Sequence, residues 1–184
     1  MLSNRYATHS EVLLATADIQ AIMTTTFVND RDLLDYAFDT RKASISTVQN
    51  ISGIQWSITF QPLPPSITQQ SLNFGNNVLG LEGAPPLILA QITISWNGIA
   101  DDDHLVTKAL DVLTDIESTA ESKALFHRYK YLDYAWPTQD RISGYGPSNK
   151  QFLQAVSKQV DPQGLFQMAC RKASSFLRSE QYLR

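Results

Sequence analysis

The sequence predicts an α+β domain in which an antiparallel β-sheet carries helices on one face. Residues 54–61 alternate apolar and polar side chains, the pattern of a strand with one covered face. Longer segments with apolar residues at helical spacing separate the strand-like segments. Such an order also suits a parallel sheet, but the one-sided alternation favours antiparallel pairing. The 184 residues, 43% hydrophobic and 18% charged, are enough for one domain over residues 1–184.

The N-terminal segment is expected to form a short helix and then a strand. Ser10 is a suitable cap for a helix over residues 11–15. Residues 19–27 are rich in Ile and Thr, which favour the pleated surface of a strand. No early apolar run is long enough for a signal peptide, and no window approaches the ~20 apolar residues of a membrane span. We therefore expect a cytoplasmic protein that does not enter the membrane.

A helix and a second strand are expected next. Asn29 or Asp30 can cap a helix over residues 32–48, in which apolar side chains recur at helical spacing. The alternating strand at 54–61 follows this helix. We expect it to end at Pro62, because proline lacks the N–H group that a strand ladder needs.

The second half is expected to contain a loop at 75–86, a strand at 87–96, a helix at 101–122, an aromatic extended segment at 126–134 and a helix at 149–160. Three aspartates begin the helix at 101–122. They complement the helix dipole there, so we favour a capping role over a metal site. In the last helix Phe152, Leu153 and Val156 are expected to point inward.

Composition and spacing argue against several function classes. The 15 basic and 18 acidic residues are spread along the chain and leave no basic face for nucleic acid. Cys170 is the single cysteine, so no internal disulfide can form. His9, His104 and His127 lie too far apart for a zinc motif, and we expect no metal. The chain has neither a G-x-S-x-G motif nor a glycine-rich phosphate loop.

Polar and aromatic residues on the expected strands are candidates for a small-molecule site. These are Gln61, Gln91, Tyr131, Asp133 and Tyr134. Glutamine and tyrosine side chains offer directed hydrogen bonds beside apolar area, which small-molecule sites need. Taken singly, ordinary sheet exposure explains the glutamines, and core packing explains the tyrosines.

Six ordered segments carry a family resemblance: TTTFVNDRDLL, IQWSITFQPLPPSI, NNVLGL, LILAQITISW, YKYLDYAWPTQDRISGYG and FLQAVSKQVDPQGLFQ. Together they resemble the C-terminal part of berberine-bridge-enzyme-like FAD-linked oxidases of the vanillyl-alcohol-oxidase superfamily. The likeness runs from about Ala21 to Gln167. Its most specific part is at about 126–167, where Tyr131-Leu132-Asp133-Tyr134 is similar to the family's Y-x-N-Y stretch.

In such enzymes the flavin lies between an FAD-binding domain and a substrate domain whose antiparallel sheet covers the cavity. The roles that the resemblance implies are substrate binding for Gln91, Gln61 and Trp96, catalysis for Tyr131 and Tyr134, and cofactor binding for Asp133. Asp133 replaces the usual asparagine, so an acceptor stands where a donor amide is expected. Leu89 replaces a lysine of many plant members. The FAD-binding domain is expected to be absent, and FAD not to be retained by this chain alone.

Three hypotheses remain open on the sequence. In the first, the chain is a split or truncated FAD-linked oxidoreductase component of natural-product biosynthesis that works with a separate flavin domain. In the second, it is a repurposed non-redox binding protein or cyclase that acts on a pathway intermediate, as a homodimer that covers its exposed face. In the third, it is an unrelated ferredoxin-like small-molecule-binding dimer. The third expects Gln91 and Tyr131 on opposite faces of the sheet.

Overall fold

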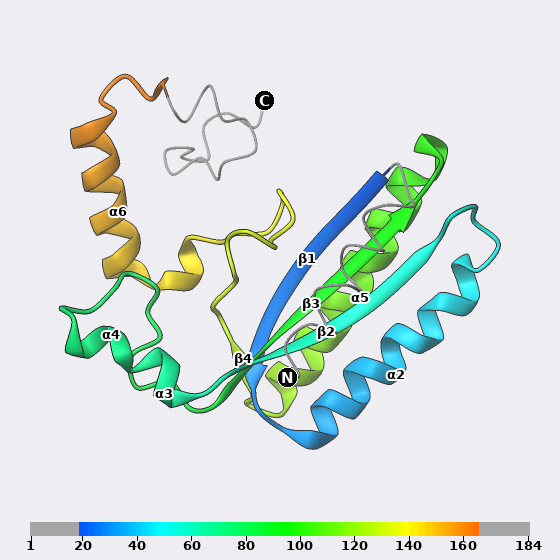
Figure 1. Cartoon of the computed structure of the whole chain (residues 1–184), viewed down its shortest axis with the longest axis horizontal. Helices are drawn as coiled ribbons and strands as arrows, with labels where there is room; N and C mark the ends of the chain where they lie inside the picture. The colour runs from blue at the N-terminus through cyan, green and yellow to red at the C-terminus, as the bar shows by residue number, and fades with distance from the viewer. Residues whose placement is uncertain (1–18, 166–184) are drawn as a thin grey trace, which may run out of the picture.

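The computed structural model describes residues 19–165 (Figure 1). The short helix expected at 11–15 and Cys170 lie outside the described residues. In chain order the elements are β1 (Ile19–Val28), α2 (Arg31–Val48), β2 (Gln55–Leu63), α3 (Pro65–Thr68), α4 (Gln70–Asn73), β3 (Leu87–Trp96), η1 (Ile99–Asp101), α5 (Asp102–Ser122), β4 (Phe126–His127), η2 (Ser143–Tyr145) and α6 (Pro147–Val160).

The four strands form one antiparallel sheet in the order β2-β3-β1-β4. β1 and β3 pair along their whole length, from Ile19 opposite Trp96 to Val28 opposite Leu87. β2 pairs with the other side of β3, and the two-residue β4 pairs with β1 at Thr26 and Phe27. The predicted α+β class with an antiparallel sheet is therefore confirmed.

Helices α2 and α5 cover one face of this sheet (Figure 1). Asp30 begins α2 as its N-cap, because its Oδ1 accepts a hydrogen bond of 2.9 Å from the Leu33 N–H group. The main core lies between the sheet and these helices. Its largest fully buried members include Met23, Phe27, Leu33, Ile92, Ile94, Trp96, Leu105 and Ile116. Alternation of side chains along each strand places these residues on one face only.

A second, smaller core lies against the opposite face at one end of the sheet. Leu87 and Leu89 of β3 point into it, because they alternate with Ile88 and Ala90 of the main core. The other buried members are Leu81, Tyr129, Ile142 and Tyr145. This core joins the sheet to the loop after α4, the segment after β4 and the start of α6 (Figure 1).

The prediction of one strand-like segment over residues 126–134 is confirmed only for its first two residues. Only Phe126 and His127 form a strand. The chain then leaves the sheet and turns at Tyr131, whose carbonyl accepts from the N–H groups of Tyr134 and Ala135. Packing in the second core fixes this segment, and local strand propensity does not decide it.

Two smaller predictions also need correction. β2 continues through Pro62 to Leu63, because β2 pairs with only one strand among the described residues and Pro62 is exposed. In α6 Phe152 is 57% exposed and Val156 is 36% exposed, so neither points inward. Leu153 packs against the second core as expected.

Candidate functional site

The sheet face opposite α2 and α5 carries most of the polar strand residues. The strand register places Thr24, Gln91 and Thr59 in one row across three strands. The neighbouring rows on this face are Ile22, Thr93 and Ser57 on one side, and Thr26, Leu89 and Gln61 on the other. We call this surface the open face because α2 and α5 do not cover it, although Thr24 and Thr26 on β1 are fully buried. It becomes apolar toward Leu87 and Leu89, where the second core begins.

Gln91 lies in the middle of the open face and is half-buried. Its Nε2 donates a 2.9 Å hydrogen bond to Thr93 Oγ1 on the same strand. That bond fixes the direction of the amide group. Gln61 lies on the same face of the edge strand β2 and is also half-buried. Both glutamines therefore present amide groups to the same side of the sheet.

Tyr131 and Tyr134 lie on the same side of the sheet as Gln91. Both pack against the second core, which contains Leu89, two residues before Gln91 on β3. Their rings meet edge to face with centroids 4.9 Å apart. The opposite-face arrangement that the ferredoxin-like hypothesis expects is not observed.

A second aromatic pair lies within the second core. Tyr129 and Tyr145 are buried, and their rings stack with centroids 5.9 Å apart at 21°. Gly144 allows this packing, because a Cβ there would lie 2.4 Å from the Arg128 carbonyl oxygen. The glycine in the Ser143–Tyr145 turn is thus required by a close backbone approach.

Asp133 sets the electrostatics of this tyrosine cluster. It is exposed, and a hydrogen bond with its carboxylate raises the pKa of Tyr131. Burial, together with the same negative charge, raises the pKa of Tyr129 and of Tyr145. The raised pKa values keep these phenols protonated to a higher pH than an ordinary tyrosine. The carboxylate of Asp133 is the hydrogen-bond acceptor for the Tyr131 hydroxyl.

Trp96 is not brought together with the other candidates. It lies on the face covered by helices, is 1% exposed, and donates its indole N–H to Asp102 Oδ1 at 2.8 Å. Asp102 therefore accepts from a core side chain at the start of α5. The preceding N-cap, Asp101, makes no side-chain capping bond, although the sequence suggested one.

Gln139 is an important residue that the sequence analysis missed. Its Oε1 accepts from the Thr24 N–H group at 3.2 Å and from the Trp136 N–H group at 2.9 Å, and its Nε2 donates to the Thr24 carbonyl at 2.8 Å. The amide thus pairs with β1 where β4 does not reach. No local pattern distinguishes this glutamine from others in loops.

Replacing Gln139 with alanine is expected to lower the free energy of unfolding by about 2 kcal/mol. Thr24 is fully buried, so its backbone groups would lose their partner without gaining water. Urea unfolding checks this value. Gln69→Ala is the control, since Gln69 is exposed, and it should change stability by less than about 0.5 kcal/mol. Equal effects of the two changes would contradict the pairing role.

Other places in the described part offer less. No group of three or more His, Cys, Asp or Glu residues there could hold a metal ion. His127 has a lowered pKa because of burial, and its Nδ1 accepts from the Tyr129 N–H group, so its role is structural. None of the helices between residues 19 and 165 has the length and apolar character to cross a membrane.

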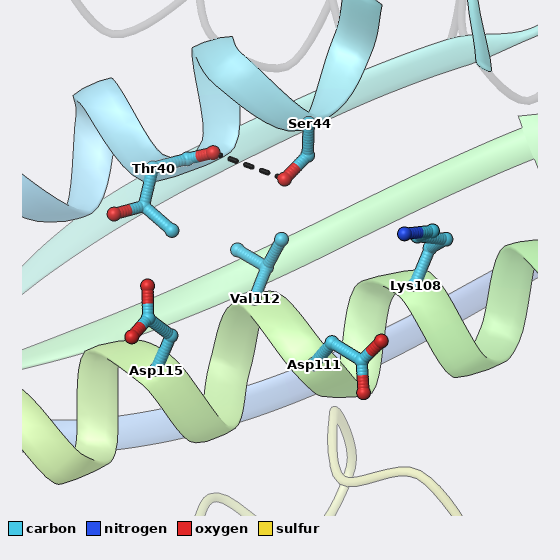
Figure 2. A pocket seen from close by; sticks show the side chains of 6 residues that line it. All are labelled: Thr40, Ser44, Lys108, Asp111, Val112 and Asp115. Carbon is cyan, nitrogen blue, oxygen red and sulfur yellow. Dashed lines mark hydrogen bonds between the residues drawn. The ribbon is translucent and has the colours of Figure 1, made fainter. Parts of the chain in front are cut away.

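A hollow of about 300 Å³ lies between α2 and α5, away from the open face (Figure 2). Its lining residues are Thr40, Ser44, Lys108, Asp111, Val112 and Asp115. Ser44 donates to the Thr40 carbonyl, and Asp115 accepts from the Tyr36 hydroxyl. Its polar groups partly satisfy one another, and it contains no candidate residue.

The open face and the starts of the two sheet-covering helices differ in how well they fit the parts of an FAD molecule. The open face with its amides and phenols suits a flat, hydrogen-bonding ring system. A diphosphate favours a helix N-terminus free of negative charge. Instead, α2 begins at Asp30-Arg31-Asp32, and α5 begins among three aspartates. The diphosphate side of the cofactor is therefore not matched at these two helices.

Comparison with known proteins shows which proteins the chain is similar to. Over 148 residues the chain is 31% identical to the FAD-dependent monooxygenase drtC of Aspergillus calidoustus, covering 79% of this chain and 28% of drtC. It is 38% identical over 112 residues to the FAD-dependent monooxygenase sdcF of Emericella nidulans, covering 60% of this chain and 23% of sdcF. Over part of its length the chain is similar to fungal FAD-dependent monooxygenases. It spans less than a third of their length.

A third relative carries a different name. The chain is 31% identical over 144 residues to the oligopeptidase PhomG' of Diaporthe leptostromiformis, covering 77% of this chain but 12% of that protein. No protein-family model matches the chain. No solved structure matches it either. The two monooxygenases thus support a similarity to FAD-dependent enzymes. The more specific likeness to berberine-bridge-type oxidases stays a prediction.

Proposed function

We propose that the chain forms the substrate-facing part of an FAD-dependent oxidoreductase that acts on a natural-product intermediate. The observation that carries the proposal is the gathering of Gln91, Gln61, Tyr131, Tyr134 and Asp133 on one side of the sheet. The cofactor is proposed from two relatives that are named FAD-dependent monooxygenases. Both are more than three times as long as the matched region, which leaves room for a flavin-binding domain. In this proposal the flavin-binding domain corresponds to the part of those relatives that has no counterpart in this chain.

Each residue has a distinct task in this proposal. Gln91 orients the substrate, because its amide direction is fixed by Thr93. Tyr131 holds the Asp133 carboxylate in place through their side-chain hydrogen bond. Asp133 accepts a proton or a hydrogen bond at its carboxylate. FAD, when bound, accepts the two electrons of the oxidation.

The test uses a fusion protein in which this chain replaces the matching part of drtC. The visible absorption spectrum of FAD bound to this fusion protein is measured. We expect Gln91→Leu and Tyr131→Phe to shift the flavin absorption bands, because both side chains face the cofactor and substrate side. Gln49→Leu, an exposed change at the end of α2, should leave the bands in place. Unchanged spectra in all three variants would reject the proposed arrangement.

The isolated chain provides a second measurement. Its spectrum is expected to lack a flavin band, because in this proposal the chain supplies only the substrate-facing side of the cofactor site. A yellow protein with stoichiometric flavin would overturn the division of labour proposed here.

The alternative is a non-redox binding protein or cyclase that uses the same open face. The same polar side chains on the open face motivate it, because Gln91 and Gln61 can orient a ligand without a flavin. A pathway intermediate that raises the melting temperature of the isolated chain, with no flavin present, would support this alternative.

A further inference from the structure

Arg141 is a buried cation that has no hydrogen-bond partner among the described residues. It is 9% exposed, and the only other buried charged side chain between residues 19 and 165 is that of Asp161. The Asp161 carboxylate accepts a 2.8 Å hydrogen bond from the Leu165 N–H group. The Arg141 Nε, in contrast, is fully buried and accepted by no group. A buried guanidinium without an acceptor is unfavourable, so an anion is expected to complete this site.

The carboxylates closest to Arg141 in the sequence and in the tyrosine cluster are engaged elsewhere. Asp140, the preceding residue, is exposed, and its Oδ1 accepts a 3.0 Å hydrogen bond from the Ser143 N–H group. Asp133 is exposed and hydrogen-bonded to Tyr131. Neither of the two ion pairs found within residues 19–165 includes Arg141. The positive charge is therefore not neutralised by this part of the chain.

Arg141 lies beside the tyrosines of the candidate site. The next residue, Ile142, and Tyr145 are both buried in the second core. Burial and the negative charge of Asp133 raise the pKa of Tyr145, and the positive charge of Arg141 opposes them. Arg141 and Asp133 thus act on the same phenol without forming an ion pair with each other.

We infer that Arg141 binds a carboxylate group of the substrate at the edge of the candidate site. This inference rests on the proposed function and adds a substrate class to it, a natural-product intermediate that carries a carboxylate. The planar guanidinium matches a carboxylate in both charge and hydrogen-bond geometry. A phosphate is a poorer occupant, because Asp133 and Asp140 repel its second negative charge more strongly.

The experiment titrates the whole chain with benzoate and with benzamide, which has the same ring but no charge, and follows binding by NMR. An aromatic probe is used because the tyrosine rings of the cluster favour aromatic contacts. Benzoate is expected to bind with a Kd about tenfold or more below that of benzamide, because only benzoate supplies a charged acceptor.

Arg141→Met removes the charge but keeps an apolar side chain of similar length. It is expected to raise the Kd of benzoate about tenfold or more and to leave that of benzamide within about twofold. Arg31→Met is the matched control, since the Arg31 side chain is 92% exposed on α2. It removes the same charge and should change the Kd of benzoate less than about twofold.

Melting curves without any ligand provide an independent measurement. Replacing a buried guanidinium that lacks a partner with an apolar side chain should leave the melting temperature unchanged or raise it. A fall larger than that caused by Arg31→Met would show that Arg141 has a partner within the chain. The inference would then be wrong.

Other results would also overturn the inference. These are equal binding of benzoate and benzamide, equal weakening by the two arginine variants, and inorganic phosphate that binds more tightly than benzoate. The titration needs no flavin, so it is separable from the proposed function. Benzoate binding that depends on Arg141, with flavin spectra that do not respond to Gln91→Leu, would reject the proposed function alone. Responsive spectra without such binding would reject the role of Arg141 alone.

Discussion

The free energy of unfolding is expected to fall as pH rises above about pH 10, by at most about 1.4 kcal/mol per pH unit for each buried phenol. Tyr129 and Tyr145 are 4% and 5% exposed, and burial raises the pKa of both phenols in the folded protein. In the unfolded chain they lose their protons near pH 10. Above that pH the folded state binds more protons than the unfolded state, so stability decreases as pH rises. Each phenol contributes about 1.4 kcal/mol per pH unit until its folded-state pKa is reached.

Urea unfolding between pH 9 and pH 11.5 measures this slope. Tyr129→Phe removes the phenol with the most strongly raised pKa and is expected to reduce the slope. Below pH 9 the contribution of both phenols is fully present, so the variant should show no change in pH dependence there. A variant whose slope above pH 10 equals that of the unchanged chain would show that Tyr129 does not hold its proton.

The strands and long helices could be predicted because local patterns determine them. Alternation at 54–61 placed Trp56, Ile58 and Phe60 toward the helices, where they now pack. The cap at Asp30 was visible because its side chain acts within three residues. The same alternation placed Gln91 and Gln61 on the accessible face, so part of the candidate site was also predictable.

The segment from Arg128 to Gly146 could not be predicted, because distant contacts fix it. Gln139 bonds to Thr24, which is 115 residues away in the sequence, and Gly144 lies against the Arg128 backbone. The apolar residues of α6 were recognised, but their spacing wrongly placed Phe152 and Val156 inward, where only Leu153 packs. The resemblance assigned Trp96 to the substrate, whereas its position in the strand places it beneath α5.

Replacing Gly80 with alanine is expected to destabilise the protein by about 2–5 kcal/mol. Gly80 has φ +69°, a left-handed conformation that costs other residues about 1–2 kcal/mol. A Cβ there would also lie 2.4 Å from the Tyr145 carbonyl oxygen. That oxygen belongs to the backbone and accepts from Asn149 Nδ2, so it cannot simply move aside. The clash adds about 1–3 kcal/mol.

Gly83→Ala separates the two causes. Gly83 has nearly the same φ, +70°, but no atom lies within 4 Å of a Cβ built there. This variant should show only the conformational cost, about 1–2 kcal/mol. The difference between the two melting curves then measures the contact between the loop after α4 and the start of α6. Equal destabilisation would show that this contact does not hold the second core together.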